Sequence, residues 1–257
     1  MTVLSSLDGQ AAAVVAFEEI DSTNAEARRR ADAGEVGPLW VTAAVQTAGR
    51  GRRGRHWDTS AGNLAATLLM TMDRSPADAA RTSFVAAVAV ADMVSDFVPE
   101  SLVRLKWPND VLLDGAKVCG ILIESGRIKD SSKLWLAIGI GVNLSHAPTD
   151  LERQATAVAD HLSADCASPP EPMNALRRLA MAFAHRLNQW DRCGFQVIAD
   201  AWTARAMGMG GPCSARLDNE TVDGVAEGLD EDGALRMRLS DGTIRRISAG
   251  DVFFGKG

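Results

Sequence analysis

The chain has 257 residues, of which 46% are hydrophobic, and a formal net charge of -6. This length is enough for one substantial core and a small second one. The acidic charge argues against extended binding to duplex DNA, which depends on many phosphate contacts. The N-terminus lacks the features of a signal peptide, and the most apolar helical run contains Asp92 and is too short to cross a bilayer. We therefore expect a globular, cytoplasmic protein that does not enter a membrane.

Cysteines and histidines do not form a metal-binding pattern. The four residues of each type lie far apart, without a CxxC or HExxH spacing. We expect reduced thiols and no structural zinc. Cys119 is interpreted as a small core residue, because no histidine lies close to it in the sequence to activate it as a nucleophile.

The first third of the chain mixes strands and helices. Apolar runs predict strands at 12–20, 39–46 and 63–72, and helical spacing predicts helices at 24–34 and 76–97. Farther on, Asp-Gly at 114–115 separates two apolar runs. This dipeptide is a strong hairpin signal, because both of its residues can take positive φ. A strand at 133–144 follows, so we expect a mixed or antiparallel sheet.

The second half of the chain changes character twice. From 151 to about 206 the pattern predicts helices, with the proline-rich stretch at 169–172 as a helix-to-helix connection. Glycines at 207–212 interrupt the chain. Short strands separated by Asn and Asp-Gly turns then predict a small β-barrel-like domain.

A basic loop stands out in this acidic chain. The stretch "QTAGRGRRGRHW", 46–57, alternates arginines with glycines. It matches GxGxxG, but no helix opens after it, as dinucleotide binding requires. It does not match a P-loop, because Arg55-His56 stands where Lys-Ser/Thr is required. The alternatives are a solvated charged loop and a loop that folds over a phosphate-bearing ligand, since arginine offers a planar fork of donors and glycine allows close backbone approach.

Three other segments carry polar residues beside predicted strands. Residues 21–24, "DSTN", either cap a helix or read a small polar ring. Residues 104–110, "RLKWPND", form either an ordinary turn or a site in which Lys106 supplies a cation and Asn109 and Asp110 supply oxygens for magnesium or a nucleotide. Lys117 is either a surface residue or a partner for a carboxylate.

Glycines predict close approach of a ligand or another segment to two strands. Gly120 follows Lys117 by three residues. In "GIGVNL", 139–144, glycines alternate, so one face of that strand is bare. Asn143 is a candidate polar contact there.

Taken in order, these motifs closely resemble those of biotin protein ligase, which activates biotin with ATP and attaches it to a lysine of a carrier protein. The resemblance runs from about Phe17 to the C-terminus. It implies an α+β fold similar to that of class II aminoacyl-tRNA synthetases, with a mainly antiparallel sheet flanked by helices. It further implies a catalytic domain at 1–208 and an SH3-like domain at 209–257.

The resemblance also implies roles for individual residues. Biotin would be held at its ureido ring by Ser22, Thr23, Asn24 and Gln46, and elsewhere by Gly49, Arg50, Gly51, Arg52, Lys117 and Gly120. ATP would be bound by Arg53, Arg55, Trp57, Lys106, Asn109, Asp110 and Asn143. Asp110 would bind Mg²⁺. Catalysis would depend on Lys117, Arg52, Arg55 and Lys106.

The resemblance implies a biotin carboxyl carrier protein as the partner. About sixteen residues precede the first matched strand, too few for the DNA-binding domain that many family members carry, so no DNA binding is expected. Homodimer formation through a sheet edge stays open. So does the C-terminal domain's role, in binding either ATP or the carrier.

Two other functions are weighed against this one. A lipoate ligase or octanoyl transferase shares the fold but needs a long apolar tunnel and no ureido contacts. A biotin-binding repressor without catalysis would lose the ATP-binding residues, which are intact here.

Overall fold

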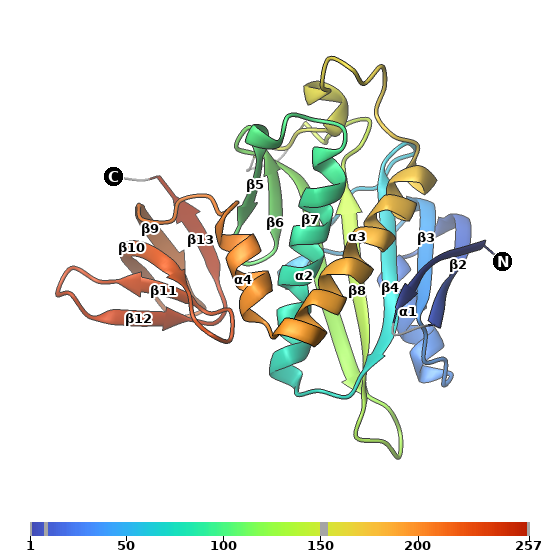
Figure 1. Cartoon of the computed structure of the whole chain (residues 1–257), viewed down its shortest axis with the longest axis horizontal. Coiled ribbons are helices and arrows are strands. Elements are labelled where there is room, and N and C mark those ends of the chain that lie inside the picture. The colour runs from blue at the N-terminus through green and yellow to red at the C-terminus, as the bar shows by residue number, and fades with distance from the viewer. Residues whose placement is uncertain (1, 8–9, 150–153, 256–257) are drawn as a thin grey trace.

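The computed structural model describes residues 2–7, 10–149 and 154–255 (Figure 1). Eight strands form the main sheet, in the order β1-β2-β3-β4-β8-β7-β6-β5. Their bounds are Thr2–Leu7, Gln10–Ile20, Leu39–Gln46 and Leu64–Met72 for β1 to β4, and Val103–Lys106, Asp110–Leu113, Ala116–Arg127 and Leu134–Val142 for β5 to β8. All neighbouring pairs are antiparallel except β2 and β3. The mixed, mainly antiparallel sheet predicted from the sequence is confirmed.

Helices cover both faces of this sheet. The helix α2 (Pro76–Ser95) and the helix α3 (Pro172–Cys193) cross one face, where the larger core lies, and α4 (Gln196–Thr203) packs beside them (Figure 1). The shorter helix α1 (Thr23–Asp32) covers part of the other face, where a smaller cluster includes Ala27 and Ala137. Because side chains alternate along a strand, the glycines that follow Ala137 at 139 and 141 point to the α1 face.

The predicted hairpin is present in the expected geometry. Asp114 and Gly115 have φ values of 48° and 80°, and they join β6 to β7. The strand β1 was not predicted. It pairs antiparallel with β2 at the edge of the sheet.

The prediction of helices from 151 onward is wrong for residues 154–171. The structure has only a short 3-10 helix, η3 (Val158–His161), in that segment, and residues 150–153 lie outside the described part. The backbone of Thr156 bonds to Lys117 and that of Val158 bonds to Asn143. These bonds to the sheet replace the intrahelical bonds of a helix. The proline-rich stretch therefore leads into α3 from a loop.

A separate five-stranded antiparallel sheet follows α4, in the order β12-β11-β10-β9-β13. Its strands are β9 (Pro212–Arg216), β10 (Thr221–Leu229), β11 (Leu235–Arg238), β12 (Ile244–Ile247) and β13 (Asp251–Phe254). The Nε1 atom of Trp107 in the first domain donates to the Gly233 carbonyl at 3.0 Å. Gly233 also lies against Phe84 of α2. The turn between β10 and β11 thus contacts the β5–β6 turn and α2, and the two sheets lie side by side (Figure 1).

No helix within the described residues is long and apolar enough to cross a membrane.

Candidate active site

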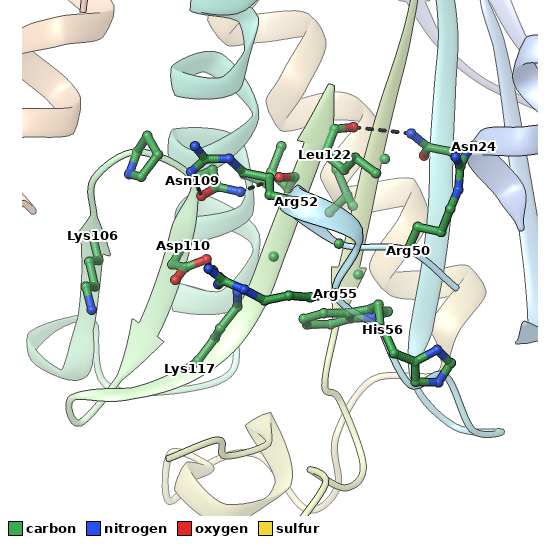
Figure 2. A pocket seen from close by; sticks show the side chains of 18 of the residues that line it. Asn24, Arg50, Arg52, Arg55, His56, Lys106, Asn109, Asp110, Lys117 and Leu122 are labelled. Atoms are coloured by element: carbon green, nitrogen blue, oxygen red, sulfur yellow. Dashed lines mark hydrogen bonds and ion pairs between the residues drawn. The ribbon is translucent and has the colours of Figure 1, made fainter. Parts of the chain in front are cut away.

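A cavity of about 830 Å³ opens on the α1 face of the main sheet. The segment before α1, the arginine loop, the β5–β6 turn, β7 and β8 form its walls, and β13 of the C-terminal sheet closes one side. The structure brings most of the predicted site residues to this cavity: Ser22, Thr23, Asn24, Gln46, Arg50, Gly51, Arg52, Arg55, Trp57, Lys106, Asn109, Asp110, Lys117 and Gly120. Figure 2 shows the cationic and acidic side chains among them.

A buried polar row lies at one end of the cavity. Ser22 caps α1, since its Oγ accepts from the Ala25 amide at 3.4 Å. Gln46 Oε1 accepts from the Thr23 amide at 2.8 Å and lies 3.1 Å from Thr23 Oγ1. The Gln46 amide nitrogen donates to Thr59 at 2.9 Å, which ties the two ends of the arginine loop together. Ser22 therefore caps the helix, and Ser22, Thr23 and Asn24 also line the cavity, so both interpretations of this segment have structural support.

Asn24 extends this row across the sheet. Its Oδ1 lies 2.7 Å from Thr67 Oγ1, and its Nδ2 donates to Glu124 Oε2 at 2.9 Å. A methyl group at Gly139 would lie 2.0 Å from Asn24 Oδ1, so this glycine makes room for the amide. Sequence reasoning missed Thr67 and Glu124, which look like ordinary strand residues.

Trp57 lies flat against the bare strands. A Cβ at Gly141 would come within 2.3 Å of the indole Nε1, and one at Gly120 within 3.0 Å of the ring. Lys117 Nζ stands 5.5 Å from the ring centroid. The alternating glycines of β8 therefore accommodate side chains of other segments, as their spacing predicted.

The arginine loop contains a short 3-10 turn, η1 (Arg52–Gly54), with Arg53 at φ 56°. Arg52 donates to Asn109 Oδ1 at 3.0 Å, which links the loop to the β5–β6 turn (Figure 2). Burial lowers the pKa of the Arg52 guanidinium from its usual value. This arginine is thus held inside the cavity.

Two further arginines of the loop contact the C-terminal sheet. Arg53 pairs with Asp218 at 2.7 Å and with Asp251 at 3.7 Å. Arg55 also pairs with Asp251. The loop therefore lies between the two domains, and Asp251 places a carboxylate beside the predicted phosphate-binding arginines.

Lys117 and Asp110 form the polar centre of the cavity. Lys117 Nζ lies 2.5 Å from Asp110 Oδ1, and Asp110 is only 8% exposed (Figure 2). Lys106 lines the other side of the cavity, 5.7 Å from the Phe253 ring of β13. The His56 side chain points away from this centre (Figure 2).

Three predicted site residues do not line the cavity. Asn143 is buried, and its amide donates to the Thr156 carbonyl at 3.1 Å, so it holds a loop in place. The expected contact of Asn143 with ATP is not supported by this position. A Cβ at Gly49 would lie 2.2 Å from the Trp57 carbonyl, so this glycine serves the loop's own close packing. Arg53 faces Asp218.

The C-terminal sheet contributes lining residues that the sequence did not identify. They are Arg216, Asp251, Val252 and Phe253. Arg216 stands 5.1 Å from the Phe253 ring centroid. No local motif marks these residues, because they reach the cavity only through the packing of one domain on the other.

The cavity combines a row of polar side chains that can hydrogen-bond to a ligand with a cluster of cationic side chains. Such a site suits a ligand with a small polar ring at one end and a negatively charged group at the other. Cations placed around developing negative charge also lower the barrier to reaction between two anionic groups.

Comparisons with known proteins agree with this geometry. Residues 16–143 match the biotin/lipoate A/B protein ligase family, and residues 209–255 match the biotin protein ligase C-terminal domain. The chain is 43% identical to a biotin--[acetyl-CoA-carboxylase] ligase of Paracoccus denitrificans, over 91% of this chain and 98% of that one. A ligase of the same description from Mycobacterium tuberculosis is 32% identical, over 90% and 85%.

A solved structure shows the same fold. The biotin protein ligase of Aquifex aeolicus, in complex with biotin and ATP, superimposes with a TM-score of 0.76 at 22% identity, covering 94% of this chain and 99% of that one. The family matches and the extent of the Paracoccus similarity lead to one conclusion: the chain belongs to the biotin protein ligase family.

Proposed function

We propose that this protein activates biotin with ATP and transfers it to a lysine of a biotin carboxyl carrier protein. The family and the ligase activity for which its relatives are named support this function. The observation that carries it is the union of a buried polar row and a cationic cluster in a single cavity.

The polar row favours a ligand that donates N–H groups. Thr67 Oγ1 lies 2.7 Å from Asn24 Oδ1 and 2.8 Å from Thr23 Oγ1, and Thr23 Oγ1 lies 3.1 Å from Gln46 Oε1. Both amide oxygens can only accept, so two hydroxyl protons must serve three oxygen–oxygen contacts. The backbone N–H of Thr23 holds the side-chain amide of Gln46 in this orientation, and Glu124 holds that of Asn24. One contact therefore lacks a proton, so acceptor positions outnumber hydroxyl protons in this row, and a ligand N–H beside Thr23 would have an oxygen to which it can donate.

This feature separates biotin from the acids of the sister enzymes. The ureido ring of biotin offers two N–H donors and one carbonyl acceptor. The dithiolane of lipoate and the chain of octanoate offer none, so they would leave the buried acceptors unpaired at a cost in binding. The lipoate or octanoate alternative is thus disfavoured by this part of the cavity.

The cationic side of the cavity suits the first chemical step. The biotin carboxylate attacks the α-phosphorus of ATP, a P–O bond forms, and the bond to pyrophosphate breaks. Lys117, Arg52 and Arg55 lower the repulsion between the two anions, and Lys106 contributes charge from the opposite side. The arginine loop covers the mixed anhydride and excludes water.

The second step uses the same centre. The neutral amine of the acceptor lysine attacks the anhydride carbonyl, an amide bond forms, and AMP leaves as the amine loses its proton. Nearby cations favour the neutral form of that amine. Lys117 contacts the oxygen that bridges the carbonyl and the phosphate, and its positive charge stabilises the negative charge that develops there as AMP leaves.

Magnesium fits this site only as a partner of ATP. Among the residues that the structure describes, no three His, Cys, Asp or Glu side chains cluster to hold a metal ion. Mg²⁺ is commonly bound by one or two carboxylates together with substrate phosphates, and Asp110 can supply one such carboxylate. Bound there, the ion would neutralise phosphate charge. Asp110 must then exchange part of its pairing with Lys117.

Several finer expectations are retained as proposals. We assign the catalytic domain to 1–208 and propose that its fold is related to that of class II aminoacyl-tRNA synthetases. We assign the C-terminal domain to 209–257 and propose that it is an SH3-like barrel. The net charge of -6 supports a ligase that does not bind DNA. Pairing of two copies through a sheet edge and a cytoplasmic location also remain predictions.

Transfer is tested with a purified biotin carboxyl carrier domain, ATP, magnesium and biotin, with streptavidin blotting as the readout. The expected result is biotinylation of the wild-type carrier but not of a carrier whose acceptor lysine is replaced by arginine. Loss of the signal with Lys117→Met would support the assigned centre. Absence of biotinylation with the wild-type protein would contradict the proposed function.

A further inference from the structure

We propose that Glu124 is a positioning residue for biotin, acting through Asn24 and Arg50. This inference rests on the proposed function. Glu124 lies on β7 and is not among the residues that line the cavity. Glu124 contacts two residues that do line the cavity, Asn24 and Arg50.

The first contact fixes an amide. Asn24 is 4% exposed, and its Nδ2 donates to Glu124 Oε2 at 2.9 Å and toward the Leu122 carbonyl at 3.4 Å (Figure 2). A carboxylate and a carbonyl can only accept, so Nδ2 must face them. Asn24 Oδ1 is thereby turned toward Thr67. The charge of Glu124 thus selects one of two amide orientations.

That orientation controls the rest of the polar row. With Asn24 Oδ1 facing it, the single proton of Thr67 is drawn to Asn24 rather than to Thr23. Thr23 is left with an unused acceptor, the feature that suits a ureido N–H. If the Asn24 amide turned over, its NH₂ would face Thr67, which could then donate to Thr23 and occupy one of the two acceptor positions of that hydroxyl, so that Thr23 would accept less readily from a ligand.

The second contact holds the arginine loop. Arg50 Nη2 lies 3.2 and 3.3 Å from the two Glu124 oxygens, and its side chain extends toward Asn24 (Figure 2). Arg50 belongs to the loop predicted to close over biotin. Glu124 therefore connects Asn24, which we expect to bind the ureido ring, to the arginine loop, which we expect to close over it. Charge-assisted bonds of this kind are about twice as strong as neutral ones.

The test compares Glu124→Gln with Glu18→Gln, which removes the same charge from an exposed position on β2. Kinetics of biotin-dependent pyrophosphate exchange separate the KM for biotin, the KM for ATP and kcat. For Glu124→Gln we expect the KM for biotin to rise about tenfold, because charge-assisted bonds become neutral ones. The KM for ATP and kcat should stay within about twofold of wild type. Glu18→Gln should match wild type in all three.

Two further variants show whether the effect acts through Asn24. In an Asn24→Ala background, Glu124→Gln should raise the KM for biotin by a clearly smaller factor than in wild type. Thermal unfolding shows that the variants are folded. An unchanged KM for biotin in Glu124→Gln, or an equal rise in both backgrounds, would overturn the inference. Absence of exchange in wild type would instead overturn the proposed function.

Discussion

Gly139 makes room for Asn24, so a single methyl group there should disturb the polar row. The Cβ of Gly139→Ala would lie 2.0 Å from Asn24 Oδ1 and 2.8 Å from its Cγ. Atoms do not approach so closely, and the amide must rotate away. That rotation breaks the bond from Thr67 at 2.7 Å and the bond to Glu124 at 2.9 Å.

The expected loss of stability follows from these two bonds. A neutral hydrogen bond contributes about 0.5–1.5 kcal/mol and one to a charged group about 1.5–3 kcal/mol. Alanine in a strand recovers roughly 0.5–1 kcal/mol relative to glycine. Gly139→Ala should therefore lower the free energy of unfolding by about 1–4 kcal/mol. It should also raise the KM for biotin.

Urea unfolding followed by tryptophan fluorescence measures this change. Gly211→Ala is the matched control, since the nearest atom to its Cβ, apart from its chain neighbours, would be the Gly208 carbonyl at 3.4 Å. In an Asn24→Ala background the obstacle is gone, and Gly139→Ala should become neutral or stabilising. Equal destabilisation with and without the Asn24 amide would refute the explanation.

Arg52→Ala should speed the dissociation of biotinyl-adenylate, because this partly buried guanidinium holds the arginine loop to the β5–β6 turn. An unchanged rate in a filter-binding chase would contradict this role. Burial raises the pKa of the Cys119 thiol, so a thiol reagent at pH 8 should label exposed Cys193 in the folded protein and reach Cys119 only after unfolding. Rapid labelling of Cys119 in native protein would oppose that assignment. Hydrogen bonds from Arg29 lower the pKa of Asp21 from 3.8 to about 2. Because the folded-state pKa is below the unfolded one, Asp21 stabilises the fold above about pH 4, and this contribution is lost as the pH falls toward 2. Both side chains are about half exposed, so the contribution is under about 1 kcal/mol, and Asp21→Asn should flatten the pH dependence of stability by that amount. If the stability of Asp21→Asn fell more steeply with decreasing pH than that of wild type, this prediction would be contradicted.

Local patterns in the sequence predicted the parts of the site that local geometry decides. The Asp114-Gly115 turn needs two residues that tolerate positive φ, and the dipeptide identifies it without tertiary information. The arginine loop was visible because four arginines among glycines are costly without a ligand. The bare face of β8 followed from alternating glycines, and its occupants proved to be Asn24 and Trp57.

The residues that sequence reasoning missed depend on strand register and domain packing. Thr67 pairs with Gly139 across β4 and β8, and this register alone brings its hydroxyl to Asn24. Asp251 reaches Arg55 only because the C-terminal sheet packs beside the first one. Neither relation leaves a local pattern. The false helix prediction for residues 154–171 has the same origin, since tertiary backbone bonds from Thr156 override local spacing.

The proposed function requires that this cavity bind biotin and ATP together and join them as an adenylate. Exchange of labelled pyrophosphate into ATP, measured with magnesium and with biotin, lipoate or octanoate in parallel, reports this reaction. We expect exchange with biotin alone, because only biotin offers the N–H donors that the row from Thr23 to Asn24 favours. Exchange with lipoate or octanoate in place of biotin, or with none of the three acids, would contradict it.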